Sequence, residues 1–83
     1  MECLHDIDHK LNKLLENRNR SLSGLFKAIR SDKRIEHIGD YPIVCYICAL
    51  ANKKWTRLQM TRALKLTDFY VRGTPKGLQQ YMK

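Results

Sequence analysis

Residues 56–78 read TRLQMTRALKLTDFYVRGTPKGL, a stretch rich in signals that start and stop helices. Thr56 and Gln59 have the spacing of a capping box, in which each side chain accepts a hydrogen bond from the backbone N–H of the other residue. Apolar residues follow at helical spacing. The sequence therefore predicts a helix over residues 56–65.

The chain after this helix carries a second set of signals. Thr67 can cap a helix over residues 67–73, and Gly73 is typical of the residue that follows a helix. Pro75 is suited to the first position of a last helix, over residues 75–82, because that position needs no backbone N–H. We expect two short helices here, joined to the first by a tight turn.

The helices expected over 56–65 and 67–73 resemble the helix-turn-helix DNA-binding superfamily. In that arrangement, apolar side chains pack inside the first helix, in the turn and midway along the second helix. Leu64, Leu66 and Val71 occupy those positions, and Leu66 would plug the turn. The resemblance implies that the second helix enters the major groove of double-stranded DNA.

The resemblance also implies a role for individual residues. The groove-facing positions of the second helix would be Thr67, Asp68, Phe69 and Arg72. Arg72 can make a bidentate contact with guanine, and Thr67 can touch a phosphate or a thymine methyl group. Phosphates would be bound by basic side chains that precede or follow this helix in the sequence, namely Lys53, Lys54, Arg57, Arg62, Lys65 and Lys76.

Positive charge is concentrated in the C-terminal half. The formal net charge is +8, and residues 1–40 hold eight bases against seven acids, whereas residues 41–83 hold eight bases against Asp68 alone. Such an excess favours a polyanionic partner. We therefore expect a DNA-binding protein with a role in transcription regulation or an accessory role. The alternative is a small helical adaptor or inhibitor that docks on an acidic protein surface.

The N-terminal region, residues 1–31, is amphipathic and nearly neutral. Residues 3–17 place apolar side chains on one helical face, and a second set follows over residues 22–29. Weak helix formers between the two sets favour a break near Asn19, with Ser21 as the N-cap of a second helix.

The apolar stripe of this region has two interpretations. Its members are Leu4, Ile7, Leu11, Leu14, Leu15, Leu22, Leu25, Phe26 and Ile29. They can form the core of the domain, or they can form the seam of a homodimer through residues 1–30. The sequence leaves both open.

Residues 43–51 form the longest apolar run. Their β-branched side chains suit a strand, but the length of the segment and Pro42 in its first turn favour a buried helix, with Asp40 as a candidate N-cap. Trp55 precedes the Thr56 cap, where a hydrophobic staple is usual, so we expect it in the core. With 83 residues, the chain predicts a single all-α domain of about four to six short helices.

Other classes of site find little support in the residues. Cys45 and Cys48 form a CxxC in the apolar run, where cysteine behaves as a small hydrophobe. Cys3, His5 and His9 lack the compact spacing of a zinc site, so we predict no metal or cofactor.

Catalysis and membrane insertion are also not expected. After Asp40 the chain holds one acid, which leaves little for general acid–base chemistry, so the sequence does not predict an enzyme. No apolar run approaches the roughly 18 residues needed to span a membrane. The first residues carry acids where a signal peptide would carry bases, so we expect a cytoplasmic protein.

Overall fold

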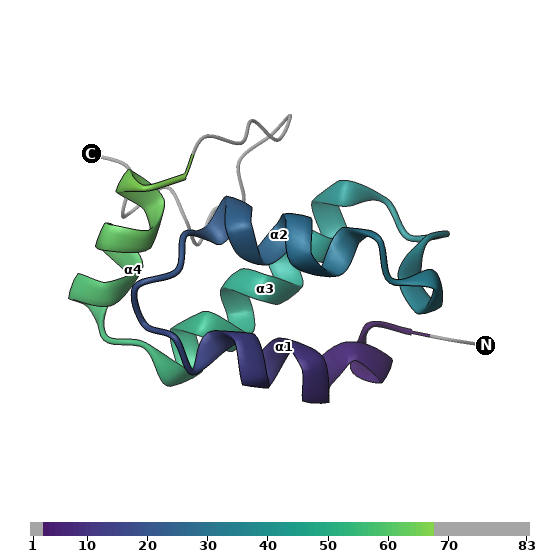
Figure 1. Ribbon diagram of the computed structural model, residues 1–83, viewed down its shortest axis with the longest axis horizontal. Helices are drawn as coiled ribbons and strands as arrows, with labels where there is room; N and C mark the ends of the chain where they lie inside the picture. Colours follow the sequence, from purple (N-terminus) through teal and green to yellow (C-terminus); the bar gives the residue numbers. More distant parts are fainter. Residues whose placement is uncertain (1–2, 68–83) are drawn as a thin grey trace.

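The computed structural model describes residues 3–67, and this part of the chain is helical and contains no strand (Figure 1). Its elements are the 3-10 helix η1 (Leu4–Ile7), α1 (Asp8–Leu15), α2 (Leu22–Arg30), the 3-10 helix η2 (Lys33–Ile35), α3 (Asp40–Lys54) and α4 (Arg57–Lys65). The all-α prediction is confirmed. The helices expected over 67–73 and 75–82, with Val71 in the first of them, lie outside the described residues.

The break between α1 and α2 is where the sequence predicted it. The Ser21 side chain accepts a hydrogen bond of 3.0 Å from the Gly24 backbone N–H and so caps α2. A Cβ atom on Gly24 would lie 3.1 Å from the Ser21 hydroxyl oxygen, so glycine gives this cap the room that it needs.

The apolar run forms α3 and not a strand. Its buried residues recur every three or four positions and are Ile43, Val44, Ile47, Cys48 and Ala51. The helix starts at Asp40, and its N-cap is Gly39, so the assignment of Asp40 as N-cap was wrong. Asp40 lies instead in the first turn, where the helix dipole stabilises a carboxylate.

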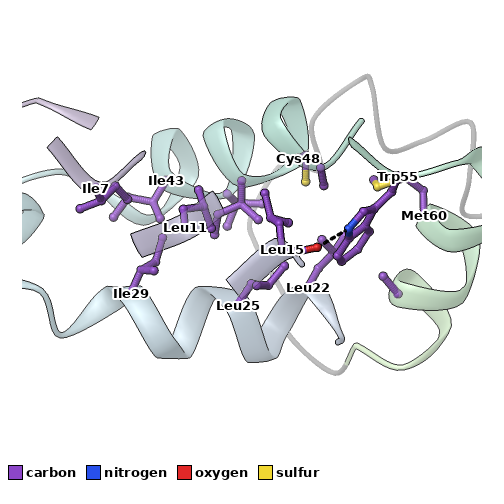
Figure 2. Packing of buried hydrophobic residues seen from close by; sticks show 14 of the residues in the cluster. Ile7, Leu11, Leu15, Leu22, Leu25, Ile29, Ile43, Cys48, Trp55 and Met60 are labelled. Atoms are coloured by element: carbon purple, nitrogen blue, oxygen red, sulfur yellow. Dashed lines mark hydrogen bonds between the residues drawn. The ribbon is translucent and has the colours of Figure 1, made fainter. Parts of the chain in front are cut away.

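The core lies between α1, α2 and α3 and extends to the start of α4 (Figure 2). Ile7, Leu11, Leu15, Leu22, Leu25 and Ile29 are at most 1% exposed. Of the two interpretations of the apolar stripe, core packing is confirmed. The buried members of the stripe have no surface left with which to form a dimer seam.

The connection between α2 and α3 is held by a carboxylate and a guanidinium. Asp32 caps η2 by accepting the Arg34 backbone N–H at 2.9 Å. The guanidinium of Arg30 donates to the carbonyl oxygens of Ile38 and Glu36, at 2.8 and 3.0 Å. These bonds satisfy backbone groups of an irregular segment. The connection can therefore remain compact although most of its residues are not helical.

Asp32 makes the stability of this connection depend on pH. Its carboxylate accepts hydrogen bonds from the Arg34 guanidinium at 2.7 and 3.0 Å, and Lys10 Nζ lies 3.7 Å away. Hydrogen bonds from Arg34 hold the pKa of Asp32 far below its usual range. A pKa that is lower in the folded state contributes stability that is fully present above about pH 4 and is lost as the pH falls further.

We expect Asp32→Asn to lower the free energy of unfolding by about 1–2 kcal/mol at neutral pH, because it removes charged hydrogen bonds but keeps a capping oxygen. Urea unfolding of both proteins between about pH 7 and pH 2 measures this. The difference between them should shrink below about pH 4, because the Asp32 carboxylate of the unfolded wild-type chain then takes up protons while that of the folded chain stays ionised. A constant difference across that range would show that the charge of Asp32 does not contribute.

Candidate nucleic-acid interface

Helix α4 starts at the predicted capping box. The Thr56 hydroxyl oxygen accepts the Gln59 N–H at 3.2 Å, and the Gln59 side-chain oxygen accepts the Thr56 N–H at 2.9 Å. The helix packs on the core through Met60 and Ala63, which are at most 1% exposed. Its other side faces outward.

Trp55 connects the start of α4 to the end of α1. Its indole is 5% exposed, and Nε1–H donates a hydrogen bond of 2.8 Å to the Leu15 carbonyl oxygen (Figure 2). Leu15 is the last residue of α1, where carbonyl groups have no partner within the helix. The prediction that Trp55 belongs to the core is confirmed, and the tryptophan also fixes where α4 begins.

The loop between α1 and α2, residues 16–21, runs beside α4 (Figure 1). The Arg18 guanidinium donates to the carbonyl oxygen of Lys54, at the end of α3. The Arg62 guanidinium donates to the side-chain oxygen of Asn19 at 3.2 Å. These bonds hold a loop from the N-terminal half against the helix from the C-terminal half.

Seven bases from these segments gather at one end of the molecule. They come from the α1–α2 loop, the end of α3 and helix α4, and are Arg18, Arg20, Lys53, Lys54, Arg57, Arg62 and Lys65. We call this set the basic end. Residues 16–21 and 53–67 contain a single acid, Glu16.

The acids of the described residues gather mostly at the other end. Asp6, Asp8, Asp32, Glu36 and Asp40 lie in or beside η1, η2 and the start of α3, away from α4 (Figure 1). Two arginines of that region are paired with acids. Arg34 lies 2.7 Å from Asp32, and Arg30 lies 3.5 Å from Asp40. Positive charge is therefore concentrated at the basic end.

Five of the residues predicted to bind DNA are exposed at the basic end, namely Lys53, Lys54, Arg57, Arg62 and Lys65. The sequence missed Arg18 and Arg20, because they belong to the half of the chain whose net charge is nearly zero. Two arginines close together in the polar segment between α1 and α2 were the available signal in the sequence. This segment reaches α4 only because α1 packs against α3. Four predicted residues, Asp68, Phe69, Arg72 and Lys76, lie outside the described residues.

Two details at the end of α4 differ from expectation. Leu66 is 56% exposed, so its assignment as the plug of the turn was wrong. Met60 and Ala63 form the buried side of α4, and Leu66 is the C-cap residue that follows the last residue of the helix, Lys65. The Thr67 hydroxyl oxygen accepts the Ser23 backbone N–H at 2.9 Å, near the start of α2, a contact that the sequence did not indicate.

The cysteines and histidines singled out in the sequence lie elsewhere. Cys45 and Cys48 are within α3, and burial raises the pKa of the Cys48 thiol to about 12, so this group is a thiol and not a thiolate at neutral pH. His5 Nδ1 lies 3.2 Å from the Tyr46 hydroxyl, which also donates to Asp8. Within residues 3–67, no three histidine, cysteine or acidic side chains form a group that could hold a metal ion.

None of the helices described is long and apolar enough to cross a membrane. No protein-family model, curated protein or solved structure matches this chain. The resemblance to the helix-turn-helix superfamily therefore stays a prediction from the sequence.

Proposed function

We propose that the protein is a small DNA-binding regulatory or accessory protein whose basic end binds the phosphates of double-stranded DNA. The observation that supports this most is the separation of charge. Seven bases from three segments share one end with one acid, while five acids lie toward the other end. This distribution would steer the basic end toward a polyanion and turn the acidic end away from it.

The shape of the basic end suits an extended row of phosphates better than a single anion. Its bases are exposed or half-exposed, and they are spread over a loop and two helices. Contacts of this kind give affinity and position without reading sequence. Docking on an acidic protein surface is the competing function, and the response to salt and to competitors separates the two.

We expect the protein to bind a random-sequence duplex, and binding should weaken steeply as salt rises. About four to six phosphate contacts should lower the logarithm of the association constant by roughly four to five for each tenfold increase in salt. Fluorescence anisotropy with a labelled duplex measures this slope, and polyglutamate at equal charge serves as the competitor. No duplex binding at low salt, or equal competition by polyglutamate, would contradict the proposal.

Self-association is a separate proposal. Since the buried residues of the stripe belong to the core, a homodimer through residues 1–30 would have to use the outer surface of α1 and α2. Sedimentation velocity at tens of micromolar, with and without duplex DNA, tests this.

A further inference from the structure

The outward side of α4 carries an unusual set of side chains for an exposed helix. Leu58, Thr61, Arg62 and Lys65 share this side, at the spacing i, i+3, i+4 and i+7. Leu58 is 72% exposed, the highest value among the exposed large hydrophobic residues. Leu58 lies among basic side chains of the same helix, and residues 55–67 contain no acidic residue.

These side chains offer the groups that read base edges in a major groove. An aliphatic side chain can contact the methyl group of thymine, and a guanidinium can contact guanine. The Thr61 hydroxyl donates to the Arg57 carbonyl oxygen at 3.0 Å, which leaves its lone pairs to accept from a base. The face is thus suited to more than phosphate binding.

The α1–α2 loop places two arginines beside this face, where they could contact the phosphate backbone of a duplex. Arg18 and Arg20 stand on the loop, which is fixed beside α4 by the bond between Arg62 and Asn19. A major groove is about 12 Å wide and admits one helix, with its phosphates at the two edges. A helix flanked by a basic loop matches that arrangement.

The segment that follows α4 is less suited to this position. Thr67, predicted to face the groove, has its hydroxyl oxygen bonded to the Ser23 N–H on the core side of the molecule. The next residue in the sequence is Asp68, whose carboxylate would be repelled by phosphates.

We infer that α4 itself enters the major groove, that Leu58 is a specificity-determining residue, and that Arg18 binds the phosphate backbone beside it. This inference rests on the proposed DNA binding and moves the reading of sequence from residues 67–73 to α4. The class of target is a duplex site that contains thymine at the position of Leu58.

The test is selection from a randomised duplex library with the wild type, Leu58→Gln and Arg72→Ala. Tyr41→Gln is the matched control, because it removes an exposed apolar side chain at the other end of α3. We expect the wild type, Tyr41→Gln and Arg72→Ala to select the same site. Leu58→Gln should lose the preference for thymine at one position by on the order of tenfold, with unchanged affinity for random DNA.

A second measurement addresses the loop. Arg18→Gln should keep the selected site and flatten the salt slope by about one contact. Circular dichroism confirms that each variant is folded.

The outcomes separate the inference from the proposed function. If the wild type binds DNA but Leu58→Gln selects the same site, or if no site is preferred, α4 does not read the groove although DNA binding stands. If Arg72→Ala alone loses the preference, reading belongs to the chain after residue 67. If the wild type binds no duplex, the proposed function fails and the inference fails with it.

Discussion

Trp55→Ala is expected to lower the free energy of unfolding by about 3–5 kcal/mol, the cost of removing a large aromatic side chain from a core. The indole is buried where the ends of α1 and α3 meet the start of α4, and it donates to the Leu15 carbonyl oxygen. The substitution leaves a cavity and a buried carbonyl group without its partner. For a domain of 83 residues, this is a large share of the total stability.

Urea unfolding followed by circular dichroism measures this effect, and two further variants assign it. Trp55→Phe keeps most of the packing and loses the N–H donor, so we expect a smaller loss of about 1–3 kcal/mol. Leu58→Ala removes an exposed side chain and should change stability by less than about 0.5 kcal/mol. Equal stability of Trp55→Ala and the wild type would mean that the core does not extend to α4.

The second large effect concerns affinity for DNA. Replacing Lys54, Arg62 and Lys65 together by glutamine is expected to weaken binding to a random duplex by about 10²- to 10³-fold at roughly 0.1 M salt. Each phosphate contact contributes about 0.9 logarithmic units to the association constant for every tenfold decrease in salt. The loss of three contacts accounts for this range. The salt slope should fall by about three contacts.

A control with the same change in net charge separates position from total charge. Lys10, Lys27 and Lys33 lie in α1, α2 and η2, outside the basic end. Replacing these three by glutamine should weaken binding far less, because a charge beyond about 10 Å from the phosphates is largely screened at this salt. If both triple variants lose affinity equally, the basic end is not the binding surface.

The sequence predicted best those features that depend on neighbouring residues. The caps of α2 and α4 are side chains that bond to backbone groups three positions away, so Ser21, Thr56 and Gln59 could be recognised directly. The period of the apolar residues was enough to give the helices and most of the core. The start of α3 was missed because its cap, Gly39, has no side chain to give a signal.

The candidate interface depended on packing and was predicted only in part. The bases on α3 and α4 were found because they are close in the sequence, whereas Arg18 and Arg20 reach the same surface only when α1 folds against α3. Leu66 is exposed at the C-cap of α4, after the last helical residue. The apolar period within the nine residues of the helix does not indicate where the side chain that follows it lies.

The hydrogen bonds that the α1–α2 loop and the first turn of α2 make with the C-terminal half have a consequence for the entropy of binding. Arg18 to Lys54, Arg62 to Asn19 and Ser23 to Thr67 fix two chain segments that would otherwise fluctuate separately. The loop and α4 therefore hold their spacing before any partner arrives. Ordering a loop or a long side chain on binding costs free energy, at about 0.5–1.5 kcal/mol for each immobilised side chain. Because this surface is ordered during folding, binding has less left to order. More of the interaction free energy of each contact is therefore retained as affinity.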